Sequence, residues 1–205
     1  MSEQALAAAR RSLHAVAELV IAGPQQASTG DIRLRVVPGG FAGTVSGVRV
    51  DGAELVWSGG RTPLAGTCHT LAAAAGVTAV APDAYQHGSG VDPDEQLVLD
   101  PEATALLLGW FARGDAALQA FAPGAERVLW PEHFDVGYAL DGVNYGVSPG
   151  DDGHPAPYAY VGPWTRRDGP FWNAPFGAAC AAAQLPEVAD VVDFFRRGRS
   201  EAARV

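Results

Sequence analysis

The sequence predicts an α+β fold: a single antiparallel sheet of about five or six strands with a buried central helix and flanking N- and C-terminal helices. Two observations indicate this. Apolar residues recur at helical spacing in three separate stretches, and runs of strand-like alternation joined by Asp-Gly turns lie between them. No internal repeat or low-complexity linker interrupts the 205 residues, so we expect a single domain over residues 1–205.

The first third of the chain predicts one helix and three strands. Residues 4–21 have an apolar stripe, with His14 and Glu18 on the polar face, and Gly23-Pro24 is expected to end the helix. Residues 31–37 alternate with the period of a strand. The Asp51-Gly52 pair predicts a hairpin between strands at 47–50 and 53–57.

Helix-start signals mark the remaining helices. Thr67 caps a short helix that Gly76 ends, and Asp100 followed by Pro101 is a strong start for a helix to about Phe121. That helix has few charges on any face, so we expect it to be the central buried one. Pro186 opens the last helix. Three further strands are expected at 127–141, 143–148 and 157–164.

Composition and charge exclude several functions. With 14 basic and 23 acidic residues the net charge is −9, so the chain lacks the positive field that nucleic acid requires. All 14 basic residues are arginine, which excludes a lysine Schiff base and a P-loop lysine. No apolar run is long enough to span a membrane, and the N-terminus has no export pattern. We therefore expect a cytoplasmic protein.

Strand alternation along 128–140 suggests a catalytic pair. His133 and Asp135 are two positions apart, so both side chains would point to one side, away from Trp130, Phe134 and Tyr138. A carboxylate beside an imidazole can orient it and raise its basicity, as general-base chemistry requires. The alternative is a polar strand face that water solvates.

Glu132 has an unusual position in the same segment. The alternation places it in the apolar row, where a carboxylate needs a partner. We expect an arginine to pair with it in a structural role, so that its removal would be strongly destabilising.

Aromatic residues downstream are candidates for ligand binding. Tyr145, Tyr158, Tyr160 and Trp164 lie on the predicted strands, where their rings could stack on a flat or sugar-like ligand or simply fill the core. His154 lies in the Gly/Pro-rich turn that follows Asp151 and Asp152. The spacing matches no metal-binding signature, so an Asx-type turn is the alternative to a metal site, and we predict neither metal nor cofactor.

Four blocks of the chain are similar to a known family. RLRVVPGGF (33–41), VLWPEHFDVG (128–137), NYGVSPGDDGHPAPYAYVGPW (144–164) and GPFWNAPFGA (169–178) resemble conserved hypothetical proteins of actinobacteria. The likeness covers nearly the whole chain. It implies a bacterial cytoplasmic protein, and because that family has no established activity, it assigns no catalytic residue.

Two functions remain open from the sequence. The first is an enzyme or a small-molecule binder whose pocket contains His133, Asp135 and the aromatic strands. The second is a structural or protein-interaction domain that forms a homodimer. A cleft at His133 would favour the first, and a large flat apolar patch would favour the second.

Overall fold

The computed structural model describes residues 2–204 and has the predicted α+β class. The antiparallel sheet has ten strands, so the expected five or six was wrong. The three additional strands are β2 (Gly40–Gly43), β5 (Gly60–Pro63) and β10 (Ala178–Ala181). The predicted strand 127–141 is two strands, β6 (Val128–Trp130) and β7 (Asp135–Leu140).

The described residues group into two compact units. The first contains the chain up to Gly109 together with Leu129–Phe134, and the second contains Trp110–Val128 and the chain from Asp135 onward. Both units therefore share the long helix α4 (Pro101–Phe121). None of the described helices is long and apolar enough to cross a membrane.

The first helix continues past the predicted stop at Gly23-Pro24. Helix α1 (Glu3–Ala15) leads into a π-helical segment, η1 (Val16–Ala22), and then into α2 (Gly23–Thr29). Gly23 N–H bonds to the carbonyl of Glu18, five residues back. Pro24 therefore falls in the first turn of a new α-helical segment, where its missing N–H costs nothing. The helix ends at Gly30, whose φ is +78°.

Six strands of the first unit follow the order β6-β1-β2-β3-β4-β5. Strand β1 spans Leu34–Val37, and β3 (Arg49–Asp51) and β4 (Glu54–Trp57) form the predicted hairpin, with Gly52 at φ +59°. The short α3 (Cys68–Ala74) starts at Thr67, as predicted. Segment η1 contacts both β2 and α3.

Helix α4 has the predicted bounds and the predicted start. The Asp100 carboxylate accepts the N–H of Ala103 at 2.9 Å, which satisfies a backbone donor that the first turn would leave free. Leu107, Phe111 and Leu118 are fully buried. The prediction that this helix is buried is thus confirmed for these side chains.

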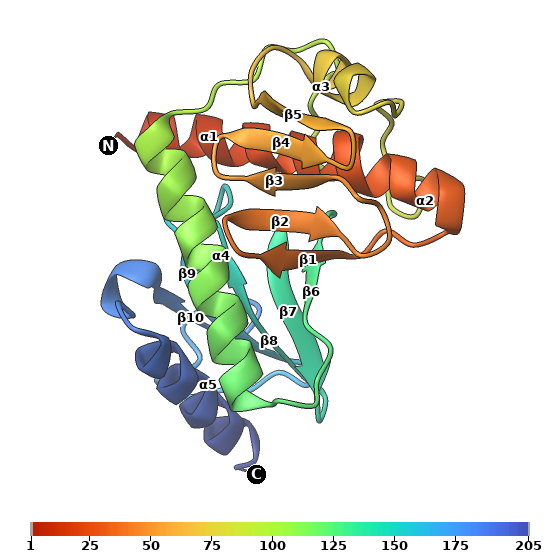
Figure 1. The fold of residues 1–205 in the computed structure, drawn as a ribbon. Helices are drawn as coiled ribbons and strands as arrows, with labels where there is room; N and C mark the ends of the chain where they lie inside the picture. Colours follow the sequence, from red (N-terminus) through yellow and green to blue (C-terminus); the bar gives the residue numbers. More distant parts are fainter. Residues whose placement is uncertain (1, 205) are drawn as a thin grey trace. The chain divides into compact units, whose positions relative to one another are not determined.

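The second unit is a meander covered by the C-terminal helix (Figure 1). Its strand order is β10-β9-β8-β7, with β8 at Val143–Ser148 and β9 at Tyr158–Pro163. A 3-10 turn, η2 (Ala182–Gln184), leads toward α5 (Val188–Ala202), which contacts β8 and β9. Phe195 of α5 packs edge-on against Tyr145 of β8, with ring centroids 5.9 Å apart.

Candidate functional site

The segment that contains His133 is a turn rather than a strand. Phe134 has φ of +53°, and its N–H donates to the carbonyl of Trp130 at 2.8 Å. A left-handed residue interrupts the alternation of faces, so the face assignment along 127–141 was wrong. The side chain of His133 is 71% exposed. Asp135, by contrast, is buried on β7. The catalytic role of His133 and Asp135 stays a prediction. The continuous strand from which it was argued is not present in the structure.

Asp135 is instead paired with Tyr160, another predicted site residue. The Tyr160 hydroxyl donates to Asp135 Oδ2 and so joins β9 to β7. Gly137 and Gly146 leave the space for this hydroxyl, which a Cβ at either position would overlap. Burial, and then the charge of Asp135, raises the pKa of Tyr160, so the phenol stays protonated. The pair acts as a buried link between strands.

The loop that holds His154 is the Asx-type turn that was one of the two alternatives. Asp151 Oδ1 accepts the N–H groups of Gly153 (2.7 Å) and His154 (2.8 Å), and Oδ2 accepts the Tyr158 hydroxyl at 2.6 Å. Burial alone would raise the pKa of Asp151, but these hydrogen bonds together lower it. The carboxylate therefore fixes the shape of the loop.

A recess of about 390 Å³ lies beside this turn, lined by His154 and Tyr158 among others. The His154 ring packs 5.0 Å from that of Tyr158 and 5.8 Å from that of Phe176. Among the described residues, no group of three or more His, Cys, Asp or Glu side chains is arranged to hold a metal ion.

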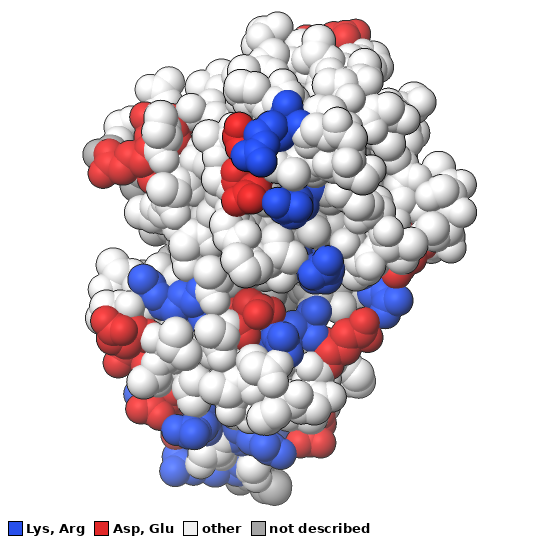
Figure 2. All heavy atoms as spheres, in the orientation of Figure 1, with Lys and Arg blue, Asp and Glu red and all other residues white. Residues whose placement is uncertain are grey.

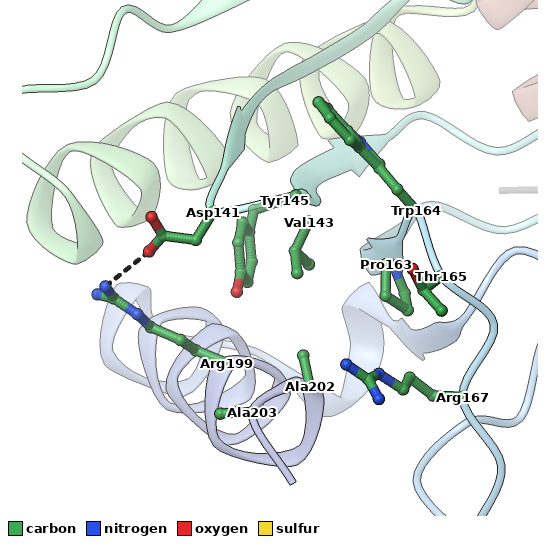
Figure 3. Close-up of a pocket in the computed structure, with 11 residues that line it drawn as sticks. Asp141, Val143, Tyr145, Pro163, Trp164, Thr165, Arg167, Arg199, Ala202 and Ala203 are labelled. Atoms are coloured by element: carbon green, nitrogen blue, oxygen red, sulfur yellow. Dashed lines mark hydrogen bonds and ion pairs between the residues drawn. The ribbon is translucent and has the colours of Figure 1, made fainter. Parts of the chain in front are cut away.

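Tyr145 and Trp164 line a different pocket, which lies at the other end of the same strands (Figure 3). Strands β8 and β9 pair from Ser148↔Tyr158 at the recess to Val143↔Pro163 at this pocket. We call it the hairpin pocket, and its volume is about 290 Å³. Its lining residues are Asp141, Gly142, Val143, Tyr145, Pro163, Trp164, Thr165, Arg167, Arg199, Ala202 and Ala203.

Local hydrogen bonds hold one wall of the hairpin pocket. Asp141 and Gly142 both have positive φ (54° and 75°), as a two-residue hairpin turn requires. The backbone N–H of Trp164 donates to the Gly142 carbonyl at 2.9 Å, and its indole N–H donates to Asn144 Oδ1 at 3.0 Å. The indole is thereby held in place although Trp164 is 72% exposed.

The two arginines of the hairpin pocket differ in their partners. Arg199 on α5 pairs with Asp141 at 3.0 Å. Arg167 has no salt bridge to any described carboxylate. Its neighbour Asp168 pairs with Arg166, with Oδ1 of Asp168 3.6 Å from Nε of Arg166. The Nε of Arg167 is buried and has no hydrogen-bond acceptor among the described residues. Figure 3 shows its guanidinium extending toward Ala202 of α5.

The position of this uncompensated charge is unusual for so acidic a chain. The net charge is −9, yet Figure 2 shows arginine side chains gathered where α5 lies in the same view. Three of these arginines are paired with carboxylates, Arg196 with Asp193, Arg199 with Asp141 and Arg204 with Glu201. The hairpin pocket therefore combines a free guanidinium with the aromatic rings of Tyr145 and Trp164.

Tyr145 contributes a ring and a hydroxyl rather than a base. Its ring is buried, with a centroid 4.8 Å from that of Phe121. Burial raises the pKa of Tyr145, so its hydroxyl stays protonated near neutral pH and can donate a hydrogen bond. Tyr145 can thus offer a ligand in the pocket one hydrogen-bond donor.

Sequence reasoning missed Arg167, Arg199 and Asp141. In the sequence, Arg199 lies among the arginines near the end of the C-terminal helix, where it complements the helix dipole, and Asp141-Gly142 is a turn signal after a polar strand face. Each has an ordinary local explanation, and they meet only because β7, the segment after β9 and α5 converge. In the sequence, Asp168 follows Arg167 and could be its partner. In the structure Asp168 pairs with Arg166 instead, so no sequence signal shows that Arg167 lacks an acidic partner.

The buried carboxylate of the first unit is Glu18, not Glu132. Glu18 is only 4% exposed, and its Oε2 accepts both the N–H (2.8 Å) and the hydroxyl of Ser89. The Glu132 side chain is 38% exposed, and its described ion pair is with His133 at 3.9 Å, not with an arginine. The prediction that Glu132 is buried was wrong. The placement of Glu18 on a polar helix face was wrong too, since every residue of η1 is buried and this segment has no solvent-exposed face.

His14, four residues before Glu18, is also largely buried. Its Nε2 lies 2.6 Å from the Pro131 carbonyl, which can only accept, so Nε2 carries the proton. The ring stacks on Phe134 at 5.2 Å. Burial lowers the pKa of His14 below 6.5, although the Pro131 carbonyl and the Glu18 charge oppose this shift.

This lowered pKa predicts a pH-dependent loss of stability. Below pH 6.5 His14 takes up a proton in the unfolded chain before it does so in the folded one, so folding loses free energy as the pH falls toward the folded-state pKa. His14→Gln keeps a donor for Pro131 but does not titrate. We expect the stability difference between wild type and His14→Gln, measured by urea unfolding, to shift against wild type between pH 7 and pH 5. A difference independent of pH would contradict the assignment.

We found no match for this chain among protein-family models, curated proteins or solved structures.

Proposed function

We propose that the hairpin pocket binds a small molecule that has one carboxylate, or a comparable anionic group, on a flat apolar body. The observation that carries the proposal is Arg167, a cation without an acidic partner among the described residues. A planar guanidinium matches the geometry of a carboxylate through two parallel hydrogen bonds. Asp141 already neutralises Arg199, so Arg167 supplies the charge for the ligand.

The size of the pocket limits the ligand. Its volume of about 290 Å³ lies just below the range of about 300–1,000 Å³ for ligand pockets, which suits one ring with a short substituent. Pro163 and Trp164 offer apolar and aromatic surface for such a ring. The protonated Tyr145 hydroxyl can donate a hydrogen bond to a polar group of the ligand.

Benzoate and benzamide test this proposal, because they have the same shape and differ in charge. By titration calorimetry, we expect wild type to bind benzoate about tenfold more tightly than benzamide, and Arg167→Gln to lose this preference. Arg166→Gln is the matched control: it removes the same charge one residue away, from a side chain paired with Asp168. We expect it to bind benzoate almost as wild type does.

Two results would overturn the proposal. Equal affinity of wild type for the two probes would remove the role of the charge. Equal losses of benzoate affinity in Arg166→Gln and Arg167→Gln would mean that only the general positive field matters.

The alternative, a structural domain that forms a homodimer, is favoured by one observation. Trp164 is 72% exposed, more than any other large apolar side chain among the described residues. If Trp164 serves self-association, Trp164→Ala would convert a dimer to a monomer in sedimentation-velocity experiments. If it serves a ligand, the sedimentation coefficient of Trp164→Ala would equal that of wild type, and only benzoate binding would weaken.

A further inference from the structure

The recess beside the His154 turn has different chemistry from the hairpin pocket. Its volume is about 390 Å³, and all of its lining residues belong to the second unit. One wall comes from the segment 153–158 and the other from the segment 173–184. No arginine, aspartate or glutamate is among the lining residues, so the recess offers a ligand neutral groups. We call it the edge recess.

Strand β10 contributes to the second wall and is the last strand at one edge of the sheet. Alternate residues of an edge strand turn their N–H groups away from the neighbouring strand. Ala182 N–H donates inward, to the Pro157 carbonyl at 2.8 Å, so the N–H of Ala181 points outward. Ala181 is exposed and lines the edge recess, and no described residue accepts this N–H. It is therefore an accessible donor.

Two amide side chains add donors at the same wall. Asn173 Oδ1 accepts the Ala179 N–H at 2.9 Å, and its Nδ2 donates to the Ala179 carbonyl at 3.1 Å. Gln184 Oε1 accepts the Cys180 thiol at 3.5 Å. One N–H of Asn173 Nδ2 and both of Gln184 Nε2 thus have no partner among the described residues. Both residues are exposed, so a ligand can reach these donors.

This lining favours a neutral ligand group that only accepts hydrogen bonds. The oxygens of both amides already have partners, so the unused capacity of the wall is in donors. A carboxylate also only accepts, but Asp151 opposes it. The Asp151 carboxylate accepts the N–H groups of Gly153 and His154 in the facing wall, and its negative charge there disfavours an anion. A carbonyl oxygen meets both requirements.

We infer that the edge recess binds a neutral small molecule that has a carbonyl oxygen, as in a ketone or a tertiary amide, next to a flat ring. The oxygen accepts from Ala181 N–H and the Gln184 amide, and the ring lies against the half-buried ring of His154. A cavity of about 150 Å³ in another protein is large enough for benzene, so about 390 Å³ accommodates one ring with a substituent.

Acetophenone and benzoate are the probes, because they have the same shape and differ in charge. In a ¹H–¹⁵N spectrum of the full chain, we expect millimolar acetophenone to shift the Ala181 N–H signal saturably. Benzoate should leave this signal almost unmoved. The test is independent of the hairpin pocket, which lies at the other end of β8 and β9 and where binding is read from Trp164.

Gln184→Glu tests the donors. It replaces the amide N–H groups by an acceptor of nearly the same shape, so the acetophenone affinity read from Ala181 should fall about fivefold. Gln86→Glu is the matched control, because it makes the same change in charge at an exposed residue of the first unit. It should leave the affinity unchanged.

Two leucine variants test the location. Ala156 lines the edge recess at an exposed position, so Ala156→Leu should fill the space and weaken acetophenone binding about tenfold. Ala183→Leu makes the same change at an exposed position of η2 outside the lining and should leave binding unchanged. Four outcomes would overturn the inference: no saturable Ala181 shift with acetophenone, an equal shift with benzoate, equal affinities in Gln184→Glu and Gln86→Glu, or full binding in Ala156→Leu.

Discussion

Glu18→Ala is expected to lower the free energy of unfolding by about 3 kcal/mol, because hydrogen bonds to a charged group contribute about 1.5–3 kcal/mol each. The substitution leaves the N–H of Ser89 without its acceptor and removes the carboxylate against which Gly88 packs. For a chain of this length the melting temperature should fall by about 6–12 °C. Thermal and urea unfolding measure both quantities.

Glu132→Ala is the matched control for this prediction. Its carboxylate is more than one-third exposed and pairs with an exposed histidine, so its loss should change stability by less than about 1 kcal/mol. Equal losses in Glu18→Ala and Glu132→Ala would contradict the burial of Glu18 that distinguishes the two.

Gly23→Ala is expected to be at least as damaging as Glu18→Ala, with a loss of about 3 kcal/mol or more. A Cβ at Gly23 would overlap the backbone carbonyl of Val80, and backbone cannot rotate away as a side chain can. Val80 is itself held by its N–H bond to the Leu19 carbonyl at 3.0 Å, so the overlap cannot be relieved without breaking that contact.

Gly109→Ala makes the same change and should have the opposite sign. Gly109 lies within α4, and no atom lies within 4 Å of a Cβ built there. Alanine should therefore stabilise the helix by about 0.5–1 kcal/mol. Chemical unfolding of the two variants beside wild type provides the measurement. If Gly23→Ala and Gly109→Ala changed the free energy of unfolding by similar amounts in the same direction, the close contact between Gly23 and the Val80 carbonyl would be contradicted.

Those elements that have local signals could be predicted from the sequence. Asp100 and Pro101 predicted the start of α4, and Asp51-Gly52 predicted the β3–β4 hairpin. The short strands β2, β5 and β10 read GFAG, GRTP and AACA, which have no alternation of apolar and polar residues. β2 and β5 are paired across two-residue turns with β1 and β4, and β10 is paired with β9, so these three strands are defined by their partners rather than by their own residue pattern.

Two errors occur where the backbone adopts an uncommon local conformation. The positive φ of Phe134 divides the predicted strand and separates the environments of His133 and Asp135. The π-helical segment η1 carries the helix beyond Pro24, and all of its residues, Glu18 included, are buried. Neither backbone state has a reliable sequence signal, because Phe rarely adopts positive φ and π-helices are rare.

The candidate site was only partly accessible to sequence reasoning. Tyr145 and Trp164 were selected because aromatic residues in strands are visible in the sequence. Arg167 was not, since its importance depends on Asp168 pairing with Arg166 rather than with it. Such a choice of partner is a property of the folded loop.

The indole N–H of Trp164 provides the most direct test of the hairpin pocket. The five tryptophans give separate indole signals in a ¹H–¹⁵N spectrum, and Trp164→Phe identifies the relevant one. We predict that benzoate shifts the Trp164 signal saturably, that benzamide at the same concentration leaves it almost unmoved, and that Arg167→Gln abolishes the benzoate shift. A Trp164 signal that benzoate does not move, or one that it moves equally in wild type and Arg167→Gln, would contradict the proposed binding site.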